Sequence, residues 1–286
     1  MHKLNEPLSA HTTFKVGGAA DVFVQPANED ELLDILQECR KSNRPHLILG
    51  NGSNLLVRDR GFRGAVISLL GLNDMYLMDD DSIYAGAGVL MKDLAEFARD
   101  HSLADFEFAH GIPGTVGGGI FMNAGAYEGE MKGIFISARC IDAQGGFVEA
   151  GINDMDFGYR KSAAQSRGLT IVSAILKGRA GDKGEITAKM SELEAKRNEK
   201  QPLDMASAGS TFKRPPGHFA GKLIMDAGLR GYSIGGAQVS EKHCGFIVNK
   251  GDATSADILA LIKYVQDAVQ EKFGIKLETE VKIIGE

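Results

Sequence analysis

The stretch from His110 to Tyr127 constrains this chain more than any other, because it carries very little side chain. It reads H-G-I-P-G-T-V-G-G-G-I-F-M-N-A-G-A-Y and contains six glycines and one proline. Backbone without side chains can approach another group closely, and successive N–H groups then form concave sites for anions such as phosphate. The segment is therefore either the binding site of a large phosphate-bearing ligand or a tightly packed structural turn.

Composition narrows the class of protein. The chain has 286 residues, enough for two or three compact units, with 43% hydrophobic and 24% charged residues, as in soluble globular proteins. A net charge of −6 and the lack of a basic stripe argue against nucleic acid as a partner. The N-terminus lacks the apolar core of a signal peptide, and no apolar run is long enough for a membrane span. These features predict a cytoplasmic protein.

The three cysteines, Cys39, Cys140 and Cys244, are far apart and odd in number, which suits a reducing compartment. The pair His243-Cys244 raises the alternative of a thiolate nucleophile. We expect a buried, inert cysteine instead, because no local catalytic signature surrounds it. Carboxylates and histidines are not grouped as a metal site requires, so no metal is predicted.

The pattern of strands, helices and turns predicts three units, at 1–68, 69–200 and 201–286. In the first, a strand at 21–25 precedes a helix that begins at Asn28-x-x-Glu31, a capping-box pattern, and ends near Lys41. A buried strand at 46–49 then leads into the Gly-rich loop 50–54, followed by strands at 55–57 and 65–67. This order of elements is typical of an α/β unit.

In the second unit the sequence predicts a strand at 82–87, a helix at 90–100, the long Gly-rich segment, and strands near 134–142 and 170–177. An exposed, highly charged helix at 184–200 leads out of it. In the third unit we expect a short helix at 219–227, a strand at 245–249 and a strand at 275–284. A long helix from Thr254-x-x-Asp257 to Phe273 lies between the last two strands, with one apolar face. That face contains Ile258, Leu261, Ile262, Val265, Ala268, Val269 and Phe273.

The familiar phosphate-binding fingerprints are absent. No Gly-x-Gly-x-x-Gly follows a strand, so a Rossmann dinucleotide site is not supported. The stretch at 216–223 imitates a P-loop, but Pro216 stands where its first glycine belongs and Leu223 where Ser or Thr belongs. Two Gly-rich loops remain, 50–54 and 111–119, from successive α/β units. We expect them to face one another and hold the pyrophosphate of one ligand.

Seven motifs now reveal a resemblance that covers nearly the whole chain. In order they are L-G-N-G-S-N-L-L-V, G-I-P-G-T-V-G-G, N-A-G-A-Y, Y-R-K-S, S-A-G-S-T-F-K-R-P, A-G-K-L-I-M-D-A-G-L-R-G and L-E-T-E-V. Together they resemble the UDP-N-acetylenolpyruvoylglucosamine reductases. The resemblance implies a mixed α+β and α/β architecture: a two-unit FAD-binding fold of the vanillyl-alcohol-oxidase type and a C-terminal α/β substrate domain, whose last strand returns to the flavin site. The short interval between Tyr159 and Ser210 indicates the type without an inserted loop.

The family's reaction implies what the chain binds. NADPH reduces FAD, and the reduced flavin delivers a hydride to C3 of UDP-N-acetylglucosamine enolpyruvate, whose C2 is then protonated to give UDP-N-acetylmuramate, a peptidoglycan precursor. With no Cys or His in a position to attach it, we expect the flavin to be non-covalent. Two alternatives stay open: another FAD oxidoreductase of this fold, or a non-catalytic protein that binds a nucleotide sugar. The sequence does not determine the oligomeric state.

Three residues match the catalytic positions of the family. Arg160 is expected to neutralise charge on the substrate carboxylate, since a guanidinium forms two parallel bonds with a carboxylate. Ser210 is expected to donate the proton to C2, with Lys213 as a candidate to stabilise its alkoxide character. Glu280 is its expected partner, although Glu278 would lie on the same face of a strand. The ordinary alternatives are a surface arginine, a serine in a turn and the polar face of a strand.

The two Gly-rich loops and the N-A-G motif supply the expected cofactor-binding residues. They are Gly50, Asn51, Gly52, Ser53, Asn54, Leu55, Gly111, Ile112, Pro113, Gly114, Gly117, Gly118, Asn123, Ala124 and Gly125. The expected substrate-binding residues are Tyr159, Lys213, Arg214, Lys222 and His243. Arg214 stands where the family commonly has Asn, which removes that amide's hydrogen bonds. Asn51 replaces a common glycine, and its tolerance of left-handed backbone angles would preserve the loop.

Overall fold

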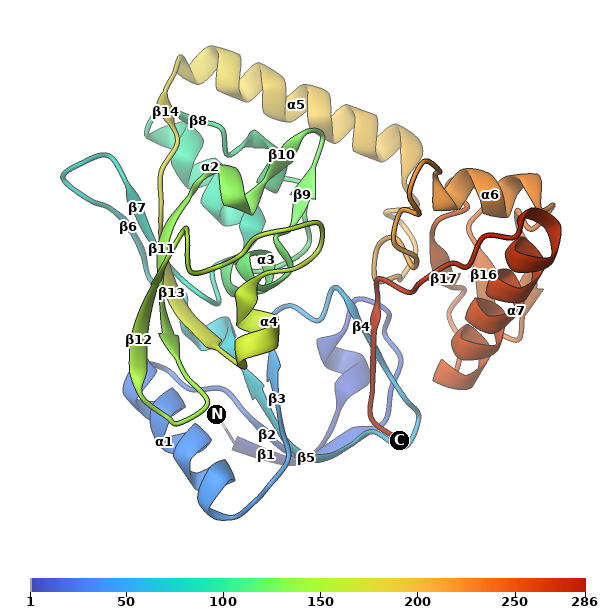
Figure 1. The fold of residues 1–286 in the computed structure, drawn as a ribbon, viewed down its shortest axis with the longest axis horizontal. Helices are drawn as coiled ribbons and strands as arrows, with labels where there is room; N and C mark the ends of the chain where they lie inside the picture. Colours follow the sequence, from blue (N-terminus) through green and yellow to red (C-terminus); the bar gives the residue numbers. More distant parts are fainter. Residues whose placement is uncertain (1) are drawn as a thin grey trace. The chain divides into compact units, whose positions relative to one another are not determined.

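The computed structural model describes residues 2–286, which form two compact units (Figure 1). The first unit contains residues 23–51 and 65–197. The second contains residues 3–22, 52–64 and 198–286. Each unit is thus built from segments that are distant in the sequence. The three sequence ranges 1–68, 69–200 and 201–286 stay a prediction.

The first unit is organised around a five-stranded antiparallel sheet with strand order β12-β11-β13-β7-β6. Its strands are β6 (Met75–Leu77), β7 (Ile83–Gly86), β11 (Phe135–Ile141), β12 (Phe147–Gly151) and β13 (Thr170–Leu176). Helix α3 (Val116–Met122) contacts β13 and β7, and α2 (Met91–Asp100) contacts α3. Short elements complete the unit: η2 (Leu69–Gly71), β8 (Leu103–Ala104), η3 (Glu107–Ala109), β9 (Gly125–Ala126), β10 (Gly129–Glu130), η4 (Met131–Gly133), α4 (Ala163–Arg167) and β14 (Arg179–Ala180).

A second sheet has the order β1-β2-β5-β3. Its strands are β1 (His2–Pro7), β2 (Ala19–Val24), β5 (Phe62–Ser68) and β3 (His46–Leu49). Strands β3 and β5 run parallel, with His46 opposite Ala65, as the predicted α/β order of elements requires. Helix α1 (Glu29–Lys41) connects β2 to β3 along the chain.

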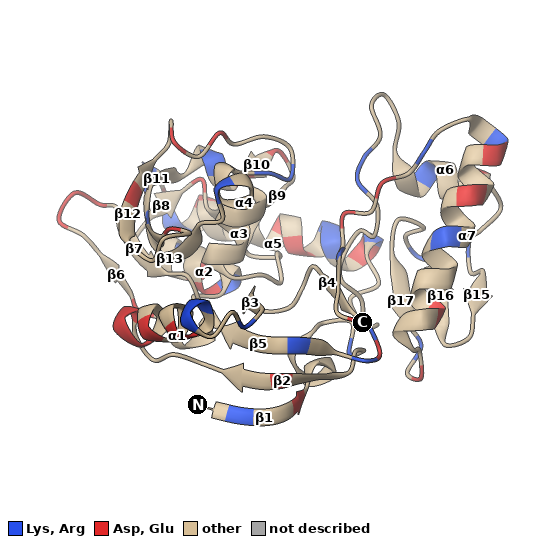
Figure 2. Cartoon of the chain, turned by 60° about the horizontal axis from the view of Figure 1, so that its bottom comes forward, with Lys and Arg blue, Asp and Glu red and all other residues tan. Residues whose placement is uncertain are grey.

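The start of α1 confirms the predicted N-cap but not the full capping box. Asn28 Oδ1 accepts from the N–H of Glu31, whereas the carboxylate of Glu31 accepts from Ala27 rather than from Asn28. Acidic residues occupy the first turn, and Arg40 and Lys41 the last, as Figure 2 shows. This arrangement complements the helix dipole at both ends.

In the second unit, α7 (Ser255–Phe273) packs on the sheet β15-β16-β17. The remaining elements are η1 (Leu8–His11), β4 (Leu55–Val57), α6 (Ala220–Asp226), β15 (Ser233–Ile234), β16 (Ala237–Val239), β17 (Ile247–Asn249) and β18 (Lys282–Ile284). The apolar face predicted for α7 is confirmed: five of its residues are fully buried, and Ala268 and Phe273 pack against the core. The five are Ile258, Leu261, Ile262, Val265 and Val269.

Two predictions about local structure are wrong. The Gly-rich segment 111–119 is not a loop throughout, because residues 116–122 form α3 with Thr115 as N-cap. The last strand is shorter than 275–284: Lys282–Ile284 forms β18, in parallel with β4, and Thr279 makes an isolated bridge to Phe212. The exposed helix α5 (Lys183–Lys200) is as predicted, with Ile186, Met190 and Leu193 as its buried residues.

The described part of the chain contains neither a membrane-spanning helix nor a cluster of metal ligands. No helix there is both long and apolar enough to cross a membrane. Nor do residues 2–286 contain a cluster of three or more His, Cys, Asp or Glu side chains suited to a metal ion.

The capping box of α7 generates a test of stability. Thr254 Oγ1 accepts from the N–H of Asp257, whose carboxylate accepts from the N–H of Thr254. Thr254→Ala should lower the free energy of unfolding by about 1 kcal/mol, because one N–H at the helix start loses its acceptor. Thr254→Ser keeps a hydroxyl and should lose much less. Urea denaturation measures both, and equal midpoints for Thr254→Ala and the unmodified protein would contradict the assignment.

Candidate functional site

The loop between β3 and β4 presents a run of unused hydrogen-bond donors. No hydrogen bond within residues 2–286 uses the backbone N–H group of any residue from Gly50 to Asn54. These residues are half-buried, and Gly52 is buried. Buried N–H groups without a partner are rare in proteins, and several in succession form an anion-binding concavity. The loop therefore has the donors that a phosphate group requires.

Asn51 preserves this loop in a different way from that expected. Its φ angle is not positive; the left-handed residue is Gly52, at φ 61°. The Asn51 amide instead donates from Nδ2 to the carbonyl oxygen of Pro113, at 2.7 Å. Next to it, a Cβ on Gly50 would lie 2.5 Å from Thr115 Oγ1. The start of the loop thus meets the Gly-rich segment, as the sequence predicted.

Within the Gly-rich segment most N–H groups are already used. Those of Val116 and Gly117 donate to carbonyls of Val89 and Ala87, and that of Gly119 donates to Thr115. By contrast, the N–H groups of Gly111, Gly114 and Thr115 have no partner among the described residues. The capacity of this segment to bind an anion through its backbone therefore lies before α3 rather than within it.

The glycines of α3 have different reasons to lack a side chain. A Cβ on Gly117 would lie 2.8 Å from Ala87 Cβ, and one on Gly119 would lie 3.0 Å from Met91 Sδ. Both glycines are buried and serve packing. Gly118 is exposed, and the nearest atom to its Cβ would be Thr115 Oγ1 at 3.4 Å, an ordinary contact. Packing within the protein does not explain Gly118, so its open face is available to a ligand.

Arg160 lies at the tip of a tight turn. Gly158 and Lys161 exchange two backbone hydrogen bonds, of 3.1 and 3.2 Å, and Arg160 has a positive φ of 55°. Its Nη2 donates to the carbonyl of Gly125 at 3.3 Å. The adjacent Tyr159 is 57% exposed, with the guanidinium carbon 5.2 Å from its ring centre. Non-glycine residues with left-handed angles often mark functional sites.

Buried Asn123 fixes this turn to the end of α3. Its Nδ2 donates to the carbonyl of Gly158 and to Glu130 Oε2, both at 3.1 Å, while its Oδ1 accepts from the N–H of Lys132. The side chain of Gln165 adds a bond to the carbonyl of Arg160. The predicted residues Asn123 and Gly125 are therefore close to Arg160, and Asn123 positions the turn that carries it.

Ser210 and Glu280 are brought together in the second unit. The N–H of Glu280 donates to the carbonyl of Thr211 at 2.8 Å, and Asn54 Nδ2 lies 3.4 Å from the carbonyl oxygen of Glu280. The Ser210 side chain is exposed, whereas Thr211 is buried and accepts from the N–H of Ile247. The backbone is thus fixed at Thr211, with exposed Ser210 directly before it and half-buried Glu280 bonded to it.

The other predicted cations have diverse environments. Lys213 Nζ lies 3.0 Å from Glu278 Oε2. Among the described residues, the side-chain partner of Lys213 is thus Glu278 and not Ser210. Lys222 pairs with Asp226 along α6, at 2.7 Å, and the guanidinium carbon of Arg214 lies 3.9 Å from the ring centre of Phe219. His243 is packed against Phe246, and burial lowers the pKa of its imidazole. It is therefore neutral at pH 7 and offers a hydrogen bond rather than a charge.

The cysteines are buried and free, as expected. Burial raises the pKa of each thiol, that of Cys140 to about 12. A thiolate nucleophile at Cys244 is therefore not supported.

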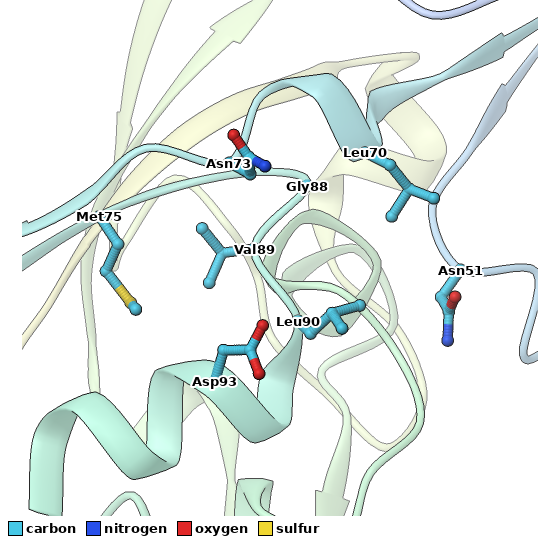
Figure 3. A pocket seen from close by; sticks show the side chains of 8 residues that line it. All are labelled: Asn51, Leu70, Asn73, Met75, Gly88, Val89, Leu90 and Asp93. Atoms are coloured by element: carbon cyan, nitrogen blue, oxygen red, sulfur yellow. The ribbon is translucent and has the colours of Figure 1, made fainter.

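A pocket of about 310 Å³ adjoins Asn51 in the first unit (Figure 3). It is lined by Asn51, Leu70, Asn73, Met75, Gly88, Val89, Leu90 and Asp93. Asp93, at the start of α2, is acidic and would repel a phosphate. The pocket is thus unsuited to the pyrophosphate for which the neighbouring loop has donors.

Comparison with known proteins adds direct evidence. Residues 20–151 match the family model of the FAD binding domain, and residues 201–284 match that of the UDP-N-acetylenolpyruvoylglucosamine reductase C-terminal domain. Curated proteins named UDP-N-acetylenolpyruvoylglucosamine reductase are 49% identical in Clostridium kluyveri and 50% in Caldanaerobacter subterraneus. Each match covers 99% of this chain and 93% of the relative.

The chain belongs to the UDP-N-acetylenolpyruvoylglucosamine reductase family. The crystal structure of that enzyme from Thermus caldophilus superposes with a TM-score of 0.85 at 35% identity, over 100% of this chain and 98% of the other. The predicted fold, an FAD-binding fold followed by the C-terminal domain of this family, is confirmed. The protein is an FAD-dependent oxidoreductase. The unpartnered N–H groups of residues 50–54 fit the pyrophosphate of that cofactor.

Sequence reasoning missed several residues that shape this site. Thr115 and Gln165 form hydrogen bonds with the predicted residues Gly118 and Arg160. Ser162 and Thr211 are bonded to Phe121 and Ile247, close in the sequence to predicted residues. Thr115 had a signal, since a threonine before a helix is a common N-cap. The glycines that follow it concealed that helix.

Gly117 and Gly118 offer a matched test. Gly118→Ala should leave the flavin-free protein as stable or up to about 1 kcal/mol more stable, because alanine favours helix. It should weaken FAD binding about tenfold, roughly 1.4 kcal/mol, if the open face of α3 meets the flavin. Gly117→Ala should instead lower stability by about 1–3 kcal/mol through its clash with Ala87. Flavin titration measures the FAD affinity of both variants, and melting curves measure their stability. Normal FAD affinity in Gly118→Ala would show that the position only serves the fold.

Proposed function

We propose that this protein catalyses the NADPH-dependent reduction of UDP-N-acetylglucosamine enolpyruvate to UDP-N-acetylmuramate, a cytoplasmic step in peptidoglycan precursor synthesis. Two things support the proposal: relatives that share about half of its residues bear the reductase name, and the site residues expected for this reaction are present. The observation that carries it is the run of unpartnered N–H groups at 50–54 beside the Gly-rich segment.

In this proposal the backbone of the two Gly-rich loops holds the FAD pyrophosphate. FAD accepts a hydride from NADPH and passes it to the substrate; the chain supplies binding, charge and a proton. Gly50 to Asn54 contribute the donors of the first loop, and Gly111, Gly114 and Thr115 those of the second. Gly118 has an open face for the cofactor, whereas Gly117 is buried against Ala87. Ile112, Pro113, Ala124 and Gly125 belong to the same proposed site. Leu55 begins β4, and Asn123 anchors the turn at 158–161.

Arg160 is proposed to stabilise the charge that grows on the substrate carboxylate when C3 is reduced. A fixed cation aimed at developing charge accelerates a reaction without any motion of its own. The turn at 158–161, tied to Asn123 and Gln165, provides this fixation. Tyr159 lies beside it and presents an exposed ring to the UDP-sugar.

Ser210 is proposed to donate the proton to C2, with Glu280 as its partner. The hydroxyl is accessible, and the backbone bond between Glu280 and Thr211 keeps the two residues adjacent. Glu278 is the weaker candidate, because Lys213 already compensates its charge. Ser210 and Glu280 both belong to the second unit.

The UDP group is proposed to meet Lys213, Arg214, Lys222 and His243 of the second unit. Arg214 and Lys222 are exposed and Lys213 is half-buried, and all three carry the charge that a pyrophosphate requires. His243 contributes as a neutral donor, since burial lowers its pKa. Ion pairs with Glu278 and Asp226 would loosen when substrate phosphates compete for Lys213 and Lys222.

A first test concerns attachment of the flavin. No cysteine or histidine lies within the two loops, so FAD should be released when the protein is unfolded. The protein is denatured in guanidinium chloride and passed through a small-pore filter, and flavin absorbance is read in the filtrate. Yellow colour retained with the polypeptide would disprove a non-covalent cofactor.

A second test separates the two half-reactions at Ser210. Ser210→Ala should leave flavin bleaching by NADPH nearly unchanged, because that step needs no proton at C2. Reoxidation by the enolpyruvyl substrate should slow by about 10²–10⁴-fold, the usual value of general acid catalysis. Stopped-flow absorbance follows both steps, with Ser207→Ala as a matched control three residues earlier.

The possible outcomes discriminate among roles. Equal slowing of both halves by Ser210→Ala would make Ser210 a structural residue. If neither half-reaction slowed, the proton donor would be water or Glu280 instead of Ser210. Bound flavin that the unmodified protein never reoxidises with this substrate would favour another oxidoreductase of the same fold, and a purified protein without flavin would favour a nucleotide-sugar-binding protein.

A further inference from the structure

Arg197, near the end of α5, extends its side chain against the Gly-rich segment of the first unit. A Cβ added to Gly111 would lie 2.7 Å from Arg197 Nη1 and 2.8 Å from its Cδ. Besides the approach of a ligand, Gly111 therefore has a second reason to lack a side chain. The arginine occupies the space that a Cβ would fill. The guanidinium thereby reaches the part of the segment whose N–H groups are unused.

The side chain of Arg197 is half-buried, and its guanidinium has no partner among residues 2–286. Its Nε is enclosed and makes no hydrogen bond, and no hydrogen bond or ion pair joins the rest of the guanidinium to another of residues 2–286. Burial lowers its pKa, yet an arginine stays protonated in proteins. Two other arginines of this unit are paired with carboxylates: Arg179 binds Asp105 through two nitrogens, and Arg139 binds Glu29.

An unpaired buried charge destabilises a fold unless something compensates it. No acidic side chain of the described chain does so; the neighbouring group that acts on its charge is the phenol of Tyr127. An anionic ligand would supply the missing partner. A guanidinium offers its donors in a planar fork that matches two oxygens of a phosphate, which is why arginine is common at phosphate sites.

We infer that Arg197 is a phosphate-binding residue, and that it donates to the FAD pyrophosphate alongside the free N–H groups of Gly111 and Gly114. The inference rests on FAD binding by this family and assigns a side chain to a site otherwise made of backbone. Phosphate oxygens could also come from the UDP group of the substrate. The experiment therefore has separate arms for the two sources.

The main experiment compares stability and cofactor affinity in Arg197→Met. Removing an uncompensated charge should leave the flavin-free protein as stable as the unmodified one, or raise its melting temperature. The same change should weaken FAD binding about 10- to 100-fold, the usual effect of losing a charge-assisted hydrogen bond. Arg197→Lys, which keeps a charge but not the fork, should fall between. Fluorescence titration of flavin-free protein measures the affinity.

Lys196→Met is the matched control, because Lys196 is the adjacent residue on α5, exposed and paired with Glu192. Its FAD affinity should stay within about twofold of the unmodified protein, since an exposed ion pair contributes little. If Arg197 had only a structural role, Arg197→Met would lower the melting temperature of the flavin-free protein and leave FAD affinity unchanged. Either of those two results would overturn the inference.

The source of the phosphate is tested with ADP and UDP as probes on flavin-free protein. Arg197→Met should weaken binding of ADP, the phosphate-bearing half of FAD, and leave binding of UDP unchanged. Loss of UDP binding alone would reject the assignment to FAD. These titrations use neither NADPH nor the enolpyruvyl substrate. Weaker ADP binding in Arg197→Met would therefore support the inference even if the proposed reaction were wrong. Unchanged ADP binding would count against the inference even if turnover were normal.

Gly111→Ala provides an independent variant that keeps the charge. Its methyl group would displace the guanidinium, so FAD affinity should fall without loss of the arginine. In the double variant Gly111→Ala/Arg197→Met, the two effects should not add, because both act through the same contact. Full additivity would show that Gly111 and Arg197 act separately and would count against the inference.

Discussion

The buried amide of Asn123 is the interaction on which the geometry of the first unit most depends. It ends α3 in a left-handed conformation, φ 44°, and its side chain makes hydrogen bonds to Gly158, Glu130 and Lys132. The partners belong to two stretches of chain, residues 130–132 and the turn at 158–161, so one side chain fixes both to the end of α3. An amide suits this position because it both donates and accepts, and leaving any of these groups unsatisfied would be costly in a buried place. The second of these stretches presents Arg160.

The density of glycine in residues 111–125 has more than one physical cause. Gly117 and Gly119 allow α3 to lie close to Ala87 and Met91, and Gly111 leaves space for Arg197. Gly118 is the exception, because no neighbour in the protein requires it. Of the two interpretations offered by the sequence, tight packing therefore holds for Gly111, Gly117 and Gly119, and a ligand site at Gly118 stays a prediction. Composition alone could not separate them, since the reason lies in what each missing Cβ would touch.

Elements with local signals were predictable, and those held by distant contacts were not. Helices α1 and α7 carry N-caps and an apolar stripe, and both appear where the sequence placed them. Helix α3 contains three glycines, which oppose helix; backbone bonds from Val116 and Gly117 to residues before α2 hold it instead. Strand β18 pairs with β4, more than two hundred positions earlier, and no local pattern indicates that partner. The catalytic candidates came from motif resemblance, whereas their supports, such as Asn123 and Thr211, emerge only from tertiary contacts.

Glu278 and Glu280 have different surroundings in the structure, although periodicity treats them alike. Residues two apart on a strand share a face, so the sequence alone could not rank them. In the structure this stretch is not a regular strand. The N–H of Lys213 donates to the carbonyl of Glu278, and the Lys213 ammonium pairs with the Glu278 carboxylate, whose side chain is 68% exposed. Glu280 is half-buried, and its backbone is bound to Thr211, next to Ser210, and approached by Asn54. A carboxylate with a compensating ammonium in open solvent has little left to contribute to a neighbouring hydroxyl. Glu280 is the carboxylate whose position the fold ties to Ser210, and this constraint, rather than its place in a motif, gives it the stronger claim to the chemistry.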